Sequence, residues 1–521
     1  MELSDVIKVA RCERVMLHQP HCLKAEATLA ITSHHLILAP LHGVELWVLH
    51  SNVDHVDRRS QGATGGSLFL LCKDLRRLQL DILGTDLFTK VADTLEDLSR
   101  VDELQLQYPF FYEPLPPPLE DGWAAFAPET ELNRMLLPGD TWRISHLNAG
   151  YKVCRSYPQL LLVPRAMEDE ELVAAALHRQ DHRLPVMAFR HLPTGAVLVR
   201  SSQAISSYNN SSSSSAAAAA AAVKRSKEDE KLLAAKLRGG GGGGVQEGEL
   251  HYPNWRRVHK PIDRRHTLLE SLAKLMDGVN DTGSSQDKWL SRVEASGWMA
   301  NIRDTLDCAC LVAQCLHQEG ASVLVHDTVG VDAALQVSAL AQVILNQDCR
   351  TVRGFEALIE REWVQAGHPF SSRHSRSCYS PPTHRHRHNS PSFLLFLDAV
   401  HQIHEQFACS FEFNQDFLVL LFEHSYSSQF GTFLGDNECE RASLGVKQRT
   451  TSLWSKTVIW TKVLLRWVLD VSPIEAAERL MTSLRETHTT LRSDVIKLRR
   501  QLQLLEEQAI KEGVLLPSTA D

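Results

Sequence analysis

The stretch VLVHDTVGVDAALQV, residues 323–337, decides the fold. A β-branched run is followed by a short loop with one glycine, Gly330, and then by an apolar stretch that is typical of a helix. A strand, a loop and a helix N-terminus in this order can hold a phosphate through backbone N–H groups. The loop nevertheless contains no Cys, Ser, Lys or Arg, and its charged residues are Asp327 and Asp332. The sequence therefore predicts an anion-binding frame that carries carboxylates.

Cysteine phosphatases use a His-Cys-x5-Arg loop. The N–H groups of that loop bind phosphate and lower the pKa of the cysteine, which attacks as a thiolate. The arginine holds two phosphate oxygens in a bidentate fork. In this chain Asp327 follows His326 at the position of the cysteine, and Ala333 stands at the position of the arginine. A carboxylate about 4 Å from a phosphate charge costs roughly 4 kcal/mol at an effective dielectric near 20, so the loop opposes the ligand that its frame suits.

Length and composition restrict the class of protein. The chain has 521 residues, 43% of them hydrophobic, which is enough for two or three domains. A net charge of −8 argues against a nucleic-acid binder. No apolar run reaches the roughly 18 residues of a membrane span, and the 11 scattered cysteines indicate reduced thiols. We expect a cytoplasmic protein that associates peripherally with membranes, without a metal ion or other cofactor.

Residues 1–107 alternate short apolar runs with turns, as in ATLAITSHHLILAP, and close with the amphipathic stretch TDLFTKVADTLEDLSRV. This pattern predicts β-hairpins followed by one helix, a small β-rich domain of the pleckstrin-homology type. Such domains often bind lipid headgroups or peptides. Five basic residues near predicted hairpin ends are candidate headgroup contacts, although solvation explains them equally well: Arg58, Arg59, Lys73, Arg76 and Arg77.

A proline-rich linker is predicted at 108–122, and strand and helix signals alternate over 123–470, which predicts an α/β domain. Low-complexity insertions interrupt that domain at 203–224 and 239–248. The segment 371–391 contains three histidines that alternate with arginines. Because those arginines oppose a cation, the pattern predicts a mobile, solvated loop and no zinc site there.

Residues 475–512 carry the heptad pattern of a coiled coil. Leucines recur every seven residues, and a second apolar seam lies between them. The predicted seam consists of Met481, Leu484, His488, Leu491, Val495, Leu498, Leu502 and Leu505. A histidine at a core position would juxtapose two imidazoles in a symmetric pair, so the pattern favours a different partner helix. An amphipathic helix folded back on its own domain is the alternative.

The chain resembles the myotubularin-related family of lipid 3-phosphatases, whose loop reads His-Cys-Ser-Asp-Gly-Trp-Asp-Arg-Thr. Stretches that resemble the family's phosphatase domain follow one another in order, including CRSYPQLLLVP, HRQDHRLPVMAFRH, HYPNWRRVHKPI, WLSRVEASGWMANI and RGFEALIEREWVQAGHPF. Within the loop, His326, Gly330 and Asp332 match the family, whereas Asp327 and Ala333 do not. The resemblance implies a β-rich PH-GRAM domain, an α/β cysteine-phosphatase-like domain and a terminal coiled coil. It also implies that a strand after KEDEKLL is missing, since six glycines stand there.

The resemblance implies a catalytically inactive branch of the family, a pseudophosphatase. Such a chain would pair through its coiled coil with an active phosphatase of the family, or alternatively with a second copy of itself, at endosomal, endoplasmic reticulum or perinuclear membranes. The partner would act on phosphatidylinositol 3-phosphate or 3,5-bisphosphate. By family analogy Asp332 would be a general acid, but an N-cap for the following helix is favoured. A stand-alone phosphoinositide-binding scaffold and, remotely, a cryptic phosphatase are the alternatives.

Overall fold

The computed structural model describes residues 3–205, 226–236, 256–456 and 472–511, apart from isolated positions. Those positions are 20–23, 42, 102, 115–117, 119, 261, 263–264, 282, 284, 382, 384 and 386–387. The chain forms two compact units, residues 1–456 and 457–521, which are described separately. The low-complexity insertions lie outside the described residues except for 203–205, as does the position of the missing strand.

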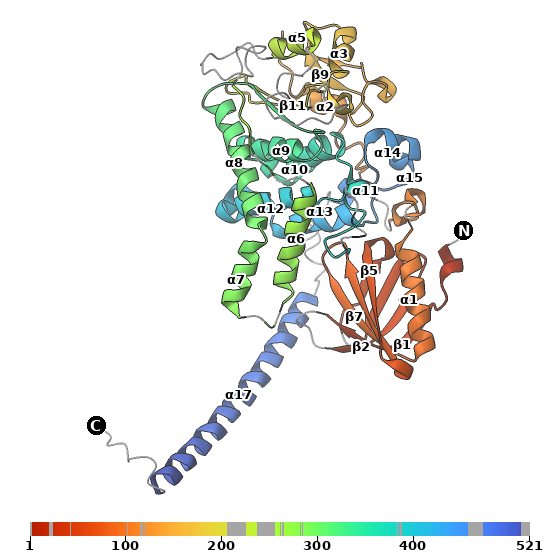
Figure 1. Cartoon of the computed structure of the whole chain (residues 1–521), viewed down its shortest axis with the longest axis vertical. Helices are drawn as coiled ribbons and strands as arrows, with labels where there is room; N and C mark the ends of the chain where they lie inside the picture. Colours follow the sequence, from red (N-terminus) through yellow and green to blue (C-terminus); the bar gives the residue numbers. More distant parts are fainter. Residues whose placement is uncertain are drawn as a thin grey trace, which may run out of the picture. The chain divides into compact units, whose positions relative to one another are not determined.

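The first unit begins with a seven-stranded antiparallel sheet, drawn in red and orange in Figure 1. Its spatial order is β4-β3-β2-β1-β7-β6-β5. The strands are β1 (Arg11–His18), β2 (Ala25–Ile31), β3 (His35–Pro40), β4 (Leu46–Leu49), β5 (Val53–Ser60), β6 (Gly65–Cys72) and β7 (Arg77–Leu83). Alternate residues of β7 are buried, so one face of the strand faces the core, as the period-2 pattern predicts.

One helix, α1 (Thr85–Ser99), packs against this sheet beside β5, β6 and β7. Its buried side chains recur at helical spacing and include Phe88, Val91, Leu95 and Leu98. The amphipathic helix predicted to close the β-rich region is therefore present.

The second part of the unit contains two small sheets. In the three-stranded sheet, β11 (Val197–Ser202) pairs antiparallel with β10 (Val186–Arg190) and parallel with β12 (Val323–Asp327). A parallel neighbour requires a long crossover, and the described part of the crossover from β11 to β12 contains four helices. The other sheet pairs β8 (Trp142–Ser145) with β9 (Leu161–Pro164).

Helices surround these strands, and α9 and α10 lie between them and α12 (Figure 1). The helices are α2 (Pro128–Asn133), α3 (Asp169–Ala176), α5 (Lys227–Lys236), α6 (Arg265–Val279), α7 (Gln286–Ala295), α8 (Trp298–His317), α9 (Ala333–Leu345), α10 (Val352–Ile359), α11 (Phe370–Arg373), α12 (Ser392–Gln406), α13 (Gln415–Tyr426), α14 (Glu438–Leu444) and α15 (Val446–Arg449). A π-helical turn, Glu360–Val364, continues α10. The core between them is aromatic and includes Trp298, Trp363, Phe393 and Phe396.

Hydrogen bonds to a buried carboxylate hold the β-rich domain against the second part of the unit. Asp54 of β5 accepts hydrogen bonds from the Ser377 N–H at 3.1 Å, the Ser377 hydroxyl at 2.6 Å and the Ser380 hydroxyl at 2.9 Å. These serines lie in the segment 371–391, for which the sequence predicts a mobile loop. That prediction is wrong for most of the described residues, because the polar side chains there pack into the domain junction and many are buried.

In the described part of the second unit, a helix of 40 residues, α17 (Ser472–Lys511), spans the predicted heptads. No described helix of the chain is long and apolar enough to cross a membrane. The helix is thus present, while its pairing with a second helix stays a prediction.

We predict that Asp54→Ala destabilises the first unit by about 2–4 kcal/mol, because three buried donors lose their acceptor. Urea unfolding, followed by intrinsic fluorescence, measures the change. The matched control is Asp57→Ala, which removes a more exposed carboxylate from the same strand. Equal unfolding midpoints for the two variants would contradict the proposed role of Asp54.

Candidate functional site

The loop between β12 and α9 has the backbone of a phosphate-binding loop. Strand β12 runs parallel to β11, with Ser201 opposite His326 and Ser202 opposite Asp327. Gly330 has φ +81°, and a Cβ there would lie 2.7 Å from the Ser201 carbonyl oxygen. Only glycine suits a left-handed backbone with so little space. The glycine therefore keeps the loop close to the end of β11.

Two buried side chains hold the loop carbonyls from outside. The Arg183 guanidinium donates to the Gly330 carbonyl at 2.9 Å and to the Ser156 hydroxyl at 2.7 Å. The His368 Nδ1–H donates to the Val331 carbonyl at 2.8 Å. These hydrogen bonds fix the orientation of the two carbonyls. The N–H groups of the loop can then converge on one point, as in an anion-binding nest.

The Asp327 carboxylate itself accepts those N–H groups. Its Oδ1 accepts the N–H of Val329 at 2.9 Å and the N–H of Gly330, and its Oδ2 accepts the N–H of Ala334 at 2.9 Å. Ala334 is the second residue of α9, so the negative charge also lies at the positive end of the helix dipole. The anion in this frame is a side chain of the chain itself.

Asp332 stands at the N-cap position of α9, as the sequence predicts, and its backbone carbonyl accepts the N–H of Gln336 at 3.1 Å. Its side chain, however, makes no capping hydrogen bond to α9. It instead forms a bidentate pair with Arg373 of α11, at 2.9 and 2.8 Å, and accepts the Ser392 hydroxyl at 3.2 Å. Burial raises the pKa of Asp332, but the hydrogen bonds and charge of Arg373 outweigh it and hold the pKa below the usual range. At neutral pH the carboxyl is ionised and has no proton to donate.

Three further positions of the loop remain, of which His326 matches the family and Val331 and Ala333 do not. His326 lies in β12 beside Asp327, and Ala333 opens α9 with a partly buried methyl side chain. Val331, which stands where the family has tryptophan, is buried in the protein. Sequence reasoning missed Arg183, His368 and Arg373. No local pattern distinguishes them, since they lie far from the loop in the chain.

A second buried ion pair lies at the same edge of the sheet. Arg179 makes a bidentate pair with Asp229 of α5 at 2.9 and 2.7 Å, and it donates to the Ser202 carbonyl at 3.0 Å. Arg179, Arg183 and Arg373 thus all have acceptors supplied by the chain.

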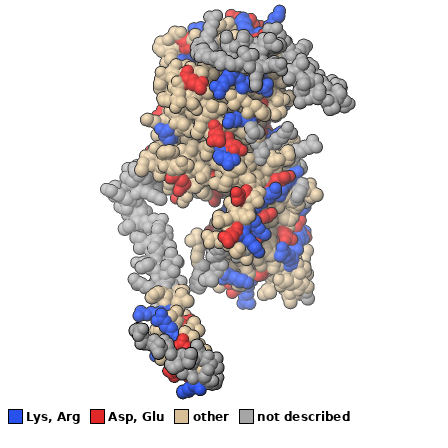
Figure 2. All heavy atoms as spheres, turned by 60° about the vertical axis from the view of Figure 1, so that its left-hand side comes forward, with Lys and Arg blue, Asp and Glu red and all other residues tan. Residues whose placement is uncertain are grey.

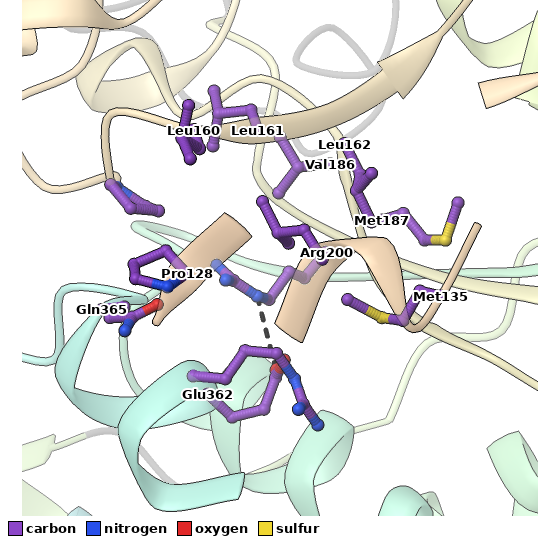
Figure 3. Close-up of a pocket in the computed structure, with 13 residues that line it drawn as sticks. Pro128, Met135, Leu160, Leu161, Leu162, Val186, Met187, Arg200, Glu362 and Gln365 are labelled. Atoms are coloured by element: carbon purple, nitrogen blue, oxygen red, sulfur yellow. Dashed lines mark ion pairs between the residues drawn. The ribbon is translucent and has the colours of Figure 1, made fainter. Parts of the chain in front are cut away.

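The cavity in Figure 3 is lined by residues that include members of β9, β10 and β11. Most of its lining side chains are apolar, among them Leu161 and Met187. The figure shows Arg200 and Glu362 facing each other across it, and their ion pair measures 3.4 Å. Arg361 is likewise paired, with Glu131 at 3.6 Å. No residue of the loop lines this cavity. Its charges are balanced, so it offers little selectivity for an anion.

The five candidate lipid contacts are mostly engaged within the β-rich domain. Arg58 pairs with Asp93 at 2.7 Å and Glu96 at 2.6 Å, both on α1. The other four are placed as follows: Arg59 pairs with Asp57 and lies over the Phe69 ring, Arg76 pairs with Asp74, Lys73 lies in the turn between β6 and β7, and Arg77 opens β7. On the face drawn in Figure 2, basic and acidic side chains are interspersed. Arg58, Arg59 and Arg76 therefore already have carboxylate partners within their own domain.

The predicted coiled-coil seam is exposed where it is described. The fractional exposure is 59% for Leu491, 47% for Val495 and 62% for Leu498. Leu502, Leu505 and His488 are exposed as well, whereas the side chains of Met481 and Leu484 lie outside the described residues. Within the second unit, no described residue covers this row of apolar side chains.

We predict that the first unit loses stability as pH falls from about 6.5 towards 4. Burial lowers the pKa of His368 to about 4 and that of His374 to about 3. In this window the unfolded chain binds protons on these histidines and the folded chain does not, so each contributes a slope of up to about 1.4 kcal/mol per pH unit. Urea midpoints measured between pH 4.5 and 7 test this prediction. His374→Gln should flatten the slope, and His266→Gln, on the surface of α6, should leave it unchanged.

We also predict that Asp327→Ala lowers the free energy of unfolding by about 2–4 kcal/mol, because three loop N–H groups lose a charged acceptor. Inorganic phosphate should restore part of that loss in the variant and have little effect on the unchanged chain, since only the variant leaves the N–H groups open to an anion. Thermal shift against phosphate concentration measures both effects. Asp307→Ala, which removes an exposed carboxylate from α8, is the control.

Comparison with known proteins agrees with this architecture. The family model for the MTMR6-9 GRAM domain matches residues 6–99, and the model for the myotubularin-like phosphatase domain matches residues 107–442. The predicted order of a β-rich PH-GRAM domain and a phosphatase-like domain is thereby confirmed.

Relatives match along most of the chain. Myotubularin-related protein 9 of Bos taurus is 43% identical over 98% of this chain and 100% of its own length. The Homo sapiens protein of that name is 42% identical over 98% of this chain and 99% of its own length. The Homo sapiens phosphatidylinositol-3,5-bisphosphate 3-phosphatase MTMR6 is 32% identical over 82% of this chain and 69% of its own length. The chain belongs to the myotubularin-related family.

Proposed function

We propose that this chain is a pseudophosphatase that regulates an active phosphatase of its own family. The observation that carries the proposal is the position of the Asp327 carboxylate, which accepts loop N–H groups of the kind that bind substrate phosphate in an active enzyme. A substrate phosphate would have to displace a side chain that is covalently part of the loop. It would also meet a like charge at close range.

The chemistry of the loop argues in the same direction. Loss of a nucleophile alone costs several orders of magnitude in turnover. Ala333 cannot hold a phosphate, and the loss of an arginine fork removes roughly another 1.5–3 kcal/mol of binding. Asp332 is ionised and bound to Arg373, so it has no proton for a leaving group. An aspartyl-phosphate mechanism at Asp327 would need a cation to offset two like charges.

The proposed partner binds through α17. Relatives of this chain include phosphatases whose names give phosphatidylinositol 3,5-bisphosphate and phosphatidylinositol 3-phosphate as substrates. An active family member of this kind would supply the cysteine, and this chain would add stability, membrane recruitment or altered substrate preference. The exposed apolar seam of α17 supports a helix–helix contact, because such a row is costly to leave in water.

The GRAM domain supports peripheral association of the complex with endosomal, endoplasmic reticulum or perinuclear membranes. A stand-alone lipid-binding scaffold is the weaker alternative. The ion pairs of Arg58, Arg59 and Arg76 within their own domain weigh against it, because a headgroup would have to compete with those carboxylates.

We predict that Leu491→Glu and Leu498→Glu each weaken binding to the active partner by at least about 30-fold, since a buried apolar contact worth about 2 kcal/mol becomes a buried charge. The full chain is co-expressed with the human phosphatase MTMR6, and co-purification and phosphate release from both lipids are measured. Ile496→Glu is the matched control. It removes an aliphatic side chain of similar exposure, 48%, from outside the seam.

The activity and vesicle-binding measurements distinguish a regulator from a cryptic phosphatase and from a lipid-binding scaffold. The chain alone should release no phosphate, and the complex should differ from the partner alone in activity, stability or vesicle binding. Phosphate release by the lone chain that disappears in Asp327→Ala would establish a cryptic phosphatase instead. Binding to phosphoinositide vesicles without any partner contact would favour the scaffold.

A further inference from the structure

The last two turns of α12 gather three side chains that suit a metal ion: His401, His404 and Glu405. One ligand atom from each lies within 4.8 Å of the others, and no second group of three such residues occurs in the part of the chain that the structure describes. Residues three and four apart lie on the same face of a helix. The spacing therefore presents two imidazoles and a carboxylate to one point.

His404 is oriented as metal-binding histidines usually are. Its Nε2–H donates to the Phe413 backbone carbonyl at 3.1 Å. Because a neutral imidazole carries one proton, this bond leaves the lone pair on Nδ1. A hydrogen bond from the other ring nitrogen to a carbonyl is the arrangement that fixes the tautomer of a ligating histidine.

The Nδ1 atoms of both histidines lack partners. Each is buried and has no hydrogen-bond partner. The Glu405 carboxylate lies 3.9 Å from the Nδ1 of His404, too far for a hydrogen bond. Burying an unsatisfied polar atom costs about 1–3 kcal/mol, and most buried side-chain polar atoms in native proteins have a partner. A bound cation would satisfy both atoms.

We propose that His401, His404 and Glu405 bind a divalent transition-metal ion, with Zn²⁺ as the physiological occupant. Two imidazoles and one carboxylate form a ligand set typical of zinc, whereas calcium and magnesium prefer oxygen ligands. Water completes the tetrahedron. Zinc bonds of about 2.0–2.1 Å place ligand atoms roughly 3.4 Å apart. The Glu405 side chain, 61% exposed, has room to rotate and close that distance.

The electrostatics of the helix favour the same assignment. The three ligands lie in the last two turns of α12, which ends at Gln406. The carbonyls of the last turn carry the negative end of the helix dipole, so a cation is stabilised there.

A second close pair of histidines among the described residues is not a metal site of this kind. His191 and His317 are joined by a hydrogen bond of 3.0 Å between ring nitrogens, so these two nitrogens satisfy each other. The sequence predicts no zinc site in the segment 371–391, where arginines oppose a cation, and no local pattern distinguishes the two histidines of α12.

The test uses the full chain, stripped of metal, with Zn²⁺ titrated against a chromophoric chelator at pH 7.5. Co²⁺ is used in parallel, because tetrahedral Co²⁺ shows visible d–d absorption. The variants are His401→Gln, His404→Gln and Glu405→Gln. His266→Gln/Glu270→Gln removes a histidine and a glutamate that are four apart and exposed on α6. A second control, His384→Gln/His386→Gln/His388→Gln, removes the three histidines that alternate with arginines in the segment 371–391.

We expect one Zn²⁺ per chain, and each ligand variant should weaken its affinity at least about tenfold and reduce the Co²⁺ absorption. Both controls should keep the affinity of the unchanged chain. Glu405→Gln tests the proposal even if a histidine variant folds poorly, because Glu405 is exposed. The proposal would be overturned if correctly folded His401→Gln and Glu405→Gln variants bound Zn²⁺ as tightly as the unchanged chain. A site that disappears with the triple histidine control would overturn it as well.

Discussion

The structure of the central loop depends on one interaction, the acceptance of loop N–H groups by the Asp327 carboxylate. A loop whose N–H groups converge on one point needs an anion there, because buried donors without an acceptor are costly. In an active cysteine phosphatase that anion is the thiolate or the substrate. Here it is Asp327, which bonds to Val329, Gly330 and Ala334 and thereby fixes the start of α9. The frame is complete without a ligand.

The surroundings of the loop follow the same principle. Asp332 binds Arg373, Asp229 binds Arg179, and Arg183 is occupied by backbone carbonyls. Removing one member of a buried pair is costly because the other charge stays behind. These pairs therefore give the domain a definite shape around its loop.

Active sites usually contain a group whose pKa lies near the working pH. Two groups packed on this loop, Asp332 and His368, have pKa values displaced from that range. Arg373 lowers the pKa of Asp332, and burial lowers the pKa of His368 to about 4. Neither exchanges protons near neutral pH. The absence of proton exchange at these two groups is consistent with a loop that does no acid–base catalysis. It supports the proposal that the chain acts through surfaces such as the exposed seam of α17.

Local patterns predicted much of the fold. The alternation in residues 1–107 predicted the hairpins and α1, the stretch at 323–337 predicted the strand, loop and helix, and the heptads predicted a long terminal helix. Each of these signals is written in neighbouring residues, because side chains repeat every two positions in a strand and every 3.6 in a helix. The segment 371–391 was mistaken for a mobile loop because its composition is polar, whereas its serines are held by Asp54, more than 300 residues away.

The sequence by itself determined that the loop has no cysteine or arginine at the required positions and that a carboxylate replaces the nucleophile. Only the tertiary structure decided what the carboxylates do. Asp332 was favoured as a cap from its position beside α9, yet Arg373, 41 residues further on, captures its charge. Asp327 takes the loop N–H groups instead. The physical reason is that a carboxylate bonds to the strongest donors within reach, and which donors come within reach depends on how distant segments pack.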